Sequence, residues 1–152
     1  MVAGDPLPDD DLALRRFDPN EKKSWSFDEA SKTERLRSGA FRFDAYEDGT
    51  AGCSVYQRGA LPRLELRVAD CLEAPRTAMA AAAAEAIRAV KRANVPDAVS
   101  PFDVVEDPYP HGEEGVHARD GAHALILHRQ DLPGNDKWYR ELAKAFYRLE
   151  VV

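Results

Sequence analysis

Residues 40–57 read A-F-R-F-D-A-Y-E-D-G-T-A-G-C-S-V-Y-Q, and this stretch decides the fold class. The apolar side chains of its first half alternate with arginine, aspartate and tyrosine, as in a strand that buries one face. Asp48 and Gly49 follow, and an Asp-Gly pair between two strand-like runs is a strong hairpin signal. The stretch therefore predicts two antiparallel strands joined by a tight turn, with the second strand over residues 53–57.

Three further segments are predicted to be strands. Apolar and charged residues alternate over residues 64–68, which indicates a third strand after a short turn. Residues 102–106 and 122–128 are predicted to form two more, because turn-forming residues precede both apolar runs. Consecutive strands with short turns indicate an antiparallel meander, and we expect about five strands in total.

Two helices complete the predicted fold. Residues 76–92 are rich in alanine, begin beside Pro75 and carry an apolar stripe at helical spacing, which is typical of an amphipathic helix. A second stripe extends over residues 138–149, and Asn135 or Asp136 would cap its start. This order of elements predicts an α+β fold, with a mostly antiparallel sheet of about five strands and two helices packed on one face.

Residues 1–34 differ from the rest of the chain. They are polar, contain three prolines and three consecutive aspartates, and have few apolar side chains, so we expect a partly ordered N-terminal arm. Residues 5–16 would form a short helix or stay flexible. Trp25 and Phe27 fit a short strand or a segment laid across the core. Residues 35–152 are then predicted to form a single α+β domain.

The composition excludes several classes of protein. The chain has 27 acidic and 21 basic residues and a formal net charge of −6, whereas a general nucleic-acid binder needs a basic face to contact phosphates. The longest uncharged apolar run, residues 77–84, is too short to span a bilayer. The first residues lack the basic and apolar regions of a signal peptide. We therefore expect a cytoplasmic protein that contacts neither membrane nor nucleic acid.

The context of the cysteines and the sequence motifs predict no cofactor. Cys53 and Cys71 belong to no metal or redox motif, so they fit two buried thiols in a reducing compartment. The glycine-rich loops that bind nucleotide phosphates are also absent from the sequence. The bias toward alanine, arginine, aspartate and valine is typical of a GC-rich bacterial genome.

Residues 116–130 hold three of the four histidines, so any chemistry is expected there. In a strand over residues 122–128, His123 and His128 point to opposite faces of the sheet. Ligands of one zinc ion must converge to about 2 Å from it. The histidines therefore predict no metal site.

A smaller catalytic set remains as a hypothesis. His117 and His123 would act as acid and base, Asp120 would orient a histidine, and Arg119 would stabilise negative charge on a phosphate or acyl oxygen. Nearby loop residues that could assist are His111, Glu113 and Glu114. The alternative is that His117 and Arg119 are solvated loop residues and that His123 is a hydrogen-bonded strand residue.

Aromatic residues predict a surface for a partner. Tyr139 and Tyr147 flank the apolar stripe of the last predicted helix, and tyrosines are enriched at protein interfaces. Trp25, in the polar arm, is a third candidate. We expect these three side chains to bind a protein partner.

The chain also carries Ser38-x-x-Phe41, Ser54-Val55 and the run H-A-L-I at residues 123–126. This skeleton resembles small bacterial proteins that have no assigned activity. The resemblance implies no catalytic residue. It implies that the strand holding His123 recurs among such proteins, and that the chain has an accessory role in a bacterial defence or toxin–antitoxin setting.

These observations favour a non-enzymatic binding or accessory module. An acidic surface suits a basic protein partner, as in an inhibitor of a nuclease. A homodimer is also compatible with the sequence. The first alternative is a His-dependent, metal-independent nuclease or phosphoesterase that uses residues 111–123. The second is a ligand-sensing domain whose pocket lies between the sheet and the helices.

Overall fold

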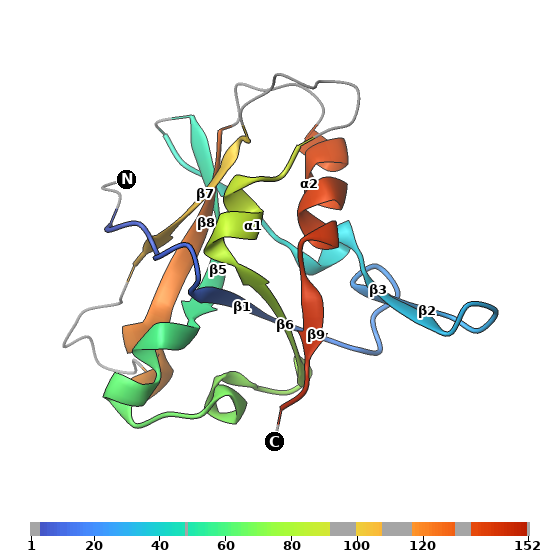
Figure 1. Ribbon diagram of the computed structural model, residues 1–152, viewed down its shortest axis with the longest axis horizontal. Coiled ribbons are helices and arrows are strands. Elements are labelled where there is room, and N and C mark those ends of the chain that lie inside the picture. The colour runs from blue at the N-terminus through green and yellow to red at the C-terminus, as the bar shows by residue number, and fades with distance from the viewer. Residues whose placement is uncertain (1–3, 48, 92–99, 108–116, 130–134, 152) are drawn as a thin grey trace.

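The main sheet of the protein is antiparallel throughout. A computed structural model describes residues 4–47, 49–91, 100–107, 117–129 and 135–151. The strand order is β7–β8–β5–β1–β6–β9, and β4 also pairs with β5. The strands are β1 (Leu12–Phe17), β4 (Asp44–Ala45), β5 (Thr50–Gln57), β6 (Ala78–Ala83), β7 (Phe102–Glu106), β8 (His123–Arg129) and β9 (Tyr147–Leu149). The predicted α+β class is confirmed (Figure 1).

Two α-helices and a separate hairpin accompany this sheet. The helices are α1 (Ala84–Arg88) and α2 (Asn135–Lys144), and neither is long and apolar enough to cross a membrane. Strands β2 (Trp25–Asp28) and β3 (Thr33–Leu36) pair only with each other and project from the body of the protein (Figure 1). The 3-10 helices are η1 (Ser38–Ala40), η2 (Arg58–Ala60), η3 (Pro62–Leu64), η4 (Val68–Cys71) and η5 (Ala118–Ala122).

Both faces of the sheet are buried, because successive side chains of a strand point to opposite faces. On β6, Ala80 and Ala82 belong to the core that α1 and α2 cover, whereas Met79 and Ala81 belong to a second core. The 3-10 turns of residues 58–71 cover this second core. The helices therefore pack on one face, as predicted, and short turns close the other.

The prediction of one long helix over residues 76–92 was wrong. Ala78–Ala83 form β6, and only Ala84–Arg88 form a helix. Alanine has the highest intrinsic helix propensity, but β6 lies between β1 and β9 and is buried on both faces. Small side chains let both layers pack closely against it, so tertiary packing overrides the local preference.

Residues 12–16, expected in a short helix or a flexible arm, instead belong to β1 inside the sheet. Three of its apolar side chains are fully buried, and Arg15 and Arg16 obscure this pattern in the sequence. The Leu7 N–H donates to the Val104 carbonyl at 3.1 Å. The residues before β1 therefore follow the edge of the sheet at β7.

The predicted hairpin is confirmed, although its first strand is shorter than expected. Ala45 pairs with Ala51, and Gly49 has a φ of 86°, a conformation that favours glycine. Asp48 lies outside the described residues. The strands predicted at residues 102–106 and 122–128 are also confirmed, as β7 and β8.

Two other predicted elements differ from the structure. Residues 64–68 are not a strand but connect the end of η3 to the start of η4, and Glu65 between them has a φ of 58°. Leu66 and Val68 still pack against the second core, whereas Leu64 is exposed. The last helix ends at Lys144, and Tyr147–Leu149 turn back into the sheet as β9.

Candidate functional site

Strand β1 separates from one of its neighbours halfway along its length. It pairs with β6 from Leu12 to Phe17, but with β5 only at Ala13 and Leu14. Farther along, β4 takes the place beside β5, where Asp44 pairs with Gly52. Between these two pairings, β5 is not paired with the second half of β1, and this leaves an opening between the two strands.

Arg15 spans this opening. Its Nε donates to the Ala40 carbonyl at 2.9 Å, and its Nη1 donates to the Ser54 carbonyl at 2.8 Å. Both acceptors are neutral, and Arg15 forms no ion pair with any residue that the structure describes. The guanidinium group is therefore held by two backbone carbonyls, without a carboxylate at ion-pair distance among the described residues.

Arginine side chains gather around this opening. A cavity of about 350 Å³ is lined by four of them, together with Leu14, Asp44, Ser54 and Tyr56. A neighbouring cavity of about 260 Å³ shares the same four arginines and adds Lys23, Asp18 and Glu21. We call the two cavities together the arginine cleft, and its shared residues are Arg15, Arg16, Arg42 and Arg76.

Among the residues that the structure describes, two of the four arginines are paired with carboxylates. Arg16 Nη1 lies 3.4 Å from Glu73 Oε2, and Arg42 Nε lies 3.3 Å from Asp44 Oδ1. The exposed side chain of Arg76 has neither an ion pair nor a hydrogen bond within the described part of the chain. Arg15 and Arg76 thus leave positive charge in a cleft of an acidic protein.

Tyr56 lies at the inner side of the cleft. Burial raises the pKa of Tyr56 above its ordinary value, against the lowering effect of the nearby Arg16 and Arg119 charges. The hydroxyl group therefore stays protonated at neutral pH and remains a hydrogen-bond donor. The Arg16 guanidinium also lies 5.9 Å from the centre of the Tyr56 ring, within the range of a cation–π contact.

Arg119, a predicted catalytic residue, is held by the protein itself. Its Nη2 donates to Glu73 Oε2 at 2.6 Å, and the Arg119 side chain is only 12% exposed. The hydrogen bond and charge of Arg119 lower the pKa of Glu73. Burial alone would lower the pKa of Arg119. The interactions with Tyr56 and Glu73 outweigh this effect, and the pKa of Arg119 is raised. Arg119 and Arg16 therefore share one carboxylate.

The other predicted catalytic residues also have partners within the protein. His117 is exposed, and its backbone N–H donates to Asp120 Oδ2 at 2.8 Å, so Asp120 caps η5. His123 is buried, and its Nδ1 lies 2.9 Å from the Asp107 carbonyl and 3.1 Å from Asp107 Oδ2. His111, Glu113 and Glu114 lie outside the described residues. None of the cavities that we describe is lined by the four predicted residues.

The two strand histidines occupy opposite faces, as expected. His123 packs beside the second core, with its ring centre 6.5 Å from that of Tyr56. His128 packs beneath the helices, with its ring centre 5.1 Å from that of Phe102. One metal ion cannot bind both side chains.

The three residues predicted to bind a partner differ in accessibility. Tyr139 is half-buried and stacks on Phe43, with ring centres 4.6 Å apart. Trp25 is half-buried between Phe17 and Arg148. Tyr147 is 50% exposed on the edge strand β9. Tyr147 is therefore the most accessible of the three.

Sequence reasoning missed the arginine cleft. One signal was present, since Arg15 and Arg16 interrupt an apolar run in L-A-L-R-R-F. Two consecutive charged residues inside a buried strand need a reason. Here the pairing of β1 with β5 ends just before them. No family model, curated protein or solved structure matches this chain.

Proposed function

We propose that this protein is a binding module that holds the phosphate group of a small ligand in the arginine cleft. The observation that carries the proposal is that Arg15 and Arg76 line the cleft and form no ion pair with another described residue. Like charges gathered in one cleft repel one another unless an anion neutralises them. The forked donors of arginine match the oxygens of a phosphate group and bind them through two parallel hydrogen bonds.

The remaining lining of the cleft supports the same ligand. Ser54 and the protonated hydroxyl group of Tyr56 line the larger cavity and add neutral hydrogen-bond donors. The larger cavity, at about 350 Å³, falls in the range typical of small-molecule sites, about 300–1,000 Å³. A phosphate group would thus meet both charged and neutral donors.

The net charge of the protein favours a small ligand over a long polyanion. At physiological ionic strength charges are screened over about 8 Å, so a ligand within the cleft interacts mainly with the arginines beside it. A nucleic acid would extend over a surface that carries the net charge of −6. Local attraction and overall acidity are therefore compatible only for a compact anion.

The other functional hypotheses receive less support from the geometry. A nuclease or phosphoesterase would need Arg119 and His123 directed at a shared substrate, but Arg119 is bound to Glu73 and His123 to Asp107. A basic protein partner recognised by the acidic surface stays a prediction from charge, as do the bacterial and cytoplasmic setting.

Arg76→Gln is the sharpest test of this proposal, because the Arg76 side chain holds no other part of the described structure. We expect isothermal titration at low salt to show saturable binding of inorganic phosphate, and the variant to bind about tenfold more weakly. The matched control is Arg63→Gln, since Arg63 is exposed on η3 outside the cleft. Equal loss in both variants, or no saturable binding to the unaltered protein, would overturn the proposal.

A further inference from the structure

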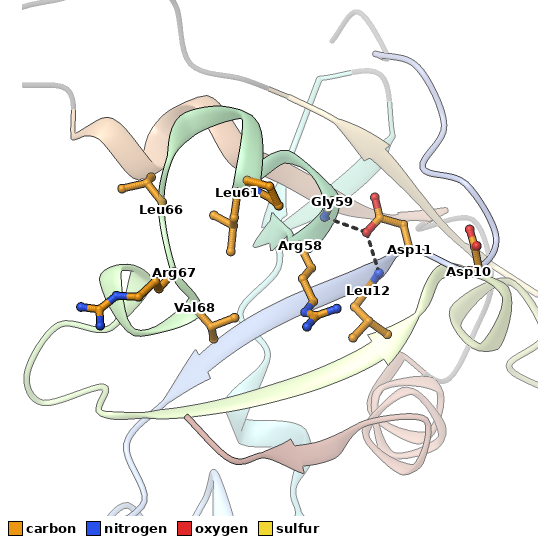
Figure 2. Close-up of a pocket in the computed structure, with 10 residues that line it drawn as sticks. Asp10, Asp11, Leu12, Arg58, Gly59, Leu61, Leu66, Arg67 and Val68 are labelled. Atoms are coloured by element: carbon orange, nitrogen blue, oxygen red, sulfur yellow. Dashed lines mark hydrogen bonds between the residues drawn. The ribbon is translucent and has the colours of Figure 1, made fainter. Parts of the chain in front are cut away.

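A second cavity, with walls of a different kind, lies between the start of β1 and the turns that follow β5 (Figure 2). Its volume is about 350 Å³, and it shares no lining residue with the arginine cleft. Leu61 is buried, and Leu12, Leu66 and Val68 are half-buried against the second core. The middle of this cavity therefore offers an aliphatic surface.

Charges of opposite sign lie at the two ends of the aliphatic surface. Figure 2 shows Asp10 at one end, Arg67 at the other, and Arg58 beside Leu12 between them. Asp10 and Arg58 are exposed and form no ion pair with another described residue. The Arg67 side chain is 78% exposed, and its ion pair with Asp70 is long, with Nε 4.0 Å from Oδ2. These charges are open to a ligand.

Asp11, in contrast, is part of the wall. Its Oδ1 accepts the N–H groups of Leu12 at 2.8 Å and Gly59 at 2.9 Å, and its Oδ2 accepts Gln57 Nε2 at 2.9 Å. A Cβ atom at position 59 would lie 2.6 Å from Asp11 Oδ2, so a larger residue there would displace the Asp11 carboxylate. These bonds fix β1 against the turn, so the cavity is formed before any ligand arrives.

We propose that this cavity binds a small zwitterion with an aliphatic body, its carboxylate beside Arg58 and Arg67 and its ammonium group beside Asp10. The aliphatic walls remove the body of such a ligand from water. The separated charges select against molecules that carry only one of the two charged groups. The site is independent of phosphate binding, because it uses different residues on another part of the sheet.

Three probes of equal chain length separate the contributions: 6-aminohexanoate, hexanoate and hexylamine. We expect 6-aminohexanoate to bind saturably by nuclear magnetic resonance titration, with chemical-shift changes at Leu12, Leu66 and Val68. Each single-charge probe should bind about threefold more weakly, since an exposed ion pair contributes little in water. Equal binding of all three probes, or no saturable binding of 6-aminohexanoate, would refute the proposal.

Variants then assign each charge to its partner. Asp10→Asn should weaken 6-aminohexanoate about threefold and leave hexanoate no weaker. The double variant Arg58→Gln, Arg67→Gln should weaken both carboxylate probes and leave hexylamine no weaker. Glu85→Gln, which removes an exposed carboxylate outside the cavity, is the matched control. Loss of affinity for a probe that lacks the partner group would contradict the assignment.

Discussion

The arginine cleft and the histidine segment differ in how the protein treats its charged side chains. In the histidine segment, Arg119 is paired with Glu73, His123 is bound to Asp107, and Asp120 caps a 3-10 turn. In the cleft, the partners of Arg15 within the described part of the chain are two backbone carbonyls. Side chains that already have partners maintain the fold. Charge without a partner, placed beside a cavity, is available to a ligand.

The largest effect that separates the two regions is expected at His123. His123→Ala removes a buried ring and its bond to Asp107, so the free energy of unfolding should fall by about 2–3 kcal/mol. Phosphate affinity of the folded variant should stay the same. Urea denaturation and phosphate titration test the two parts.

His117→Ala is the control for that prediction. His117 is exposed, so its replacement should change the free energy of unfolding by less than about 0.5 kcal/mol. A folded His123→Ala protein that binds phosphate tenfold more weakly would place the histidine segment inside the functional site.

A smaller effect is expected when Arg15 is replaced. Arg15→Gln removes the charge and should weaken phosphate binding about tenfold. Arg15→Lys keeps the charge but loses the forked donors, so its affinity should fall between those of Arg15→Gln and the unaltered protein. Isothermal titration of both variants measures the order. If Arg15→Lys binds no better than Arg15→Gln, charge at this position does not contribute to binding.

The smallest effect concerns pH. Because Arg119 lowers the pKa of Glu73 in the folded protein, the ion pair stabilises the fold above the unfolded pKa, and this contribution is lost as pH falls through the lower folded pKa. Glu73→Gln should therefore lower Tm slightly at pH 7, and the difference from the unaltered protein should vanish in strong acid. Thermal unfolding across this pH range measures it. A difference that grows in acid would contradict the sign.

Local patterns were sufficient to predict several elements of the fold. Strands β7 and β8 and the turn at Gly49 were recognised because alternation and turn chemistry act within a few residues. Strand β6 was missed because its alanines suit either a helix or a doubly buried strand. Only the strands on either side distinguish these outcomes, and the sequence of the segment does not contain that information.

The candidate site was harder to predict for a related reason. Arg15 and Arg76 come from distant parts of the chain, and the antiparallel pairing of β1 with β6, which begins two residues after Arg76, brings them to the same end of the sheet. Three of the histidines lie within fifteen residues, and this clustering in sequence predicted chemistry there. Proximity in sequence did not place them in one cavity, since alternation along β8 directs His123 and His128 to opposite faces.

A crystal structure with bound phosphate tests the central claim most directly, because both regions are observed in one experiment. The account predicts phosphate density in the cleft, within hydrogen-bonding distance of Arg76 and Arg15, with the Arg119–Glu73 pair unchanged. Density beside Arg119 and His123 instead, with Glu73 displaced, would contradict it and would identify the histidine segment as the site.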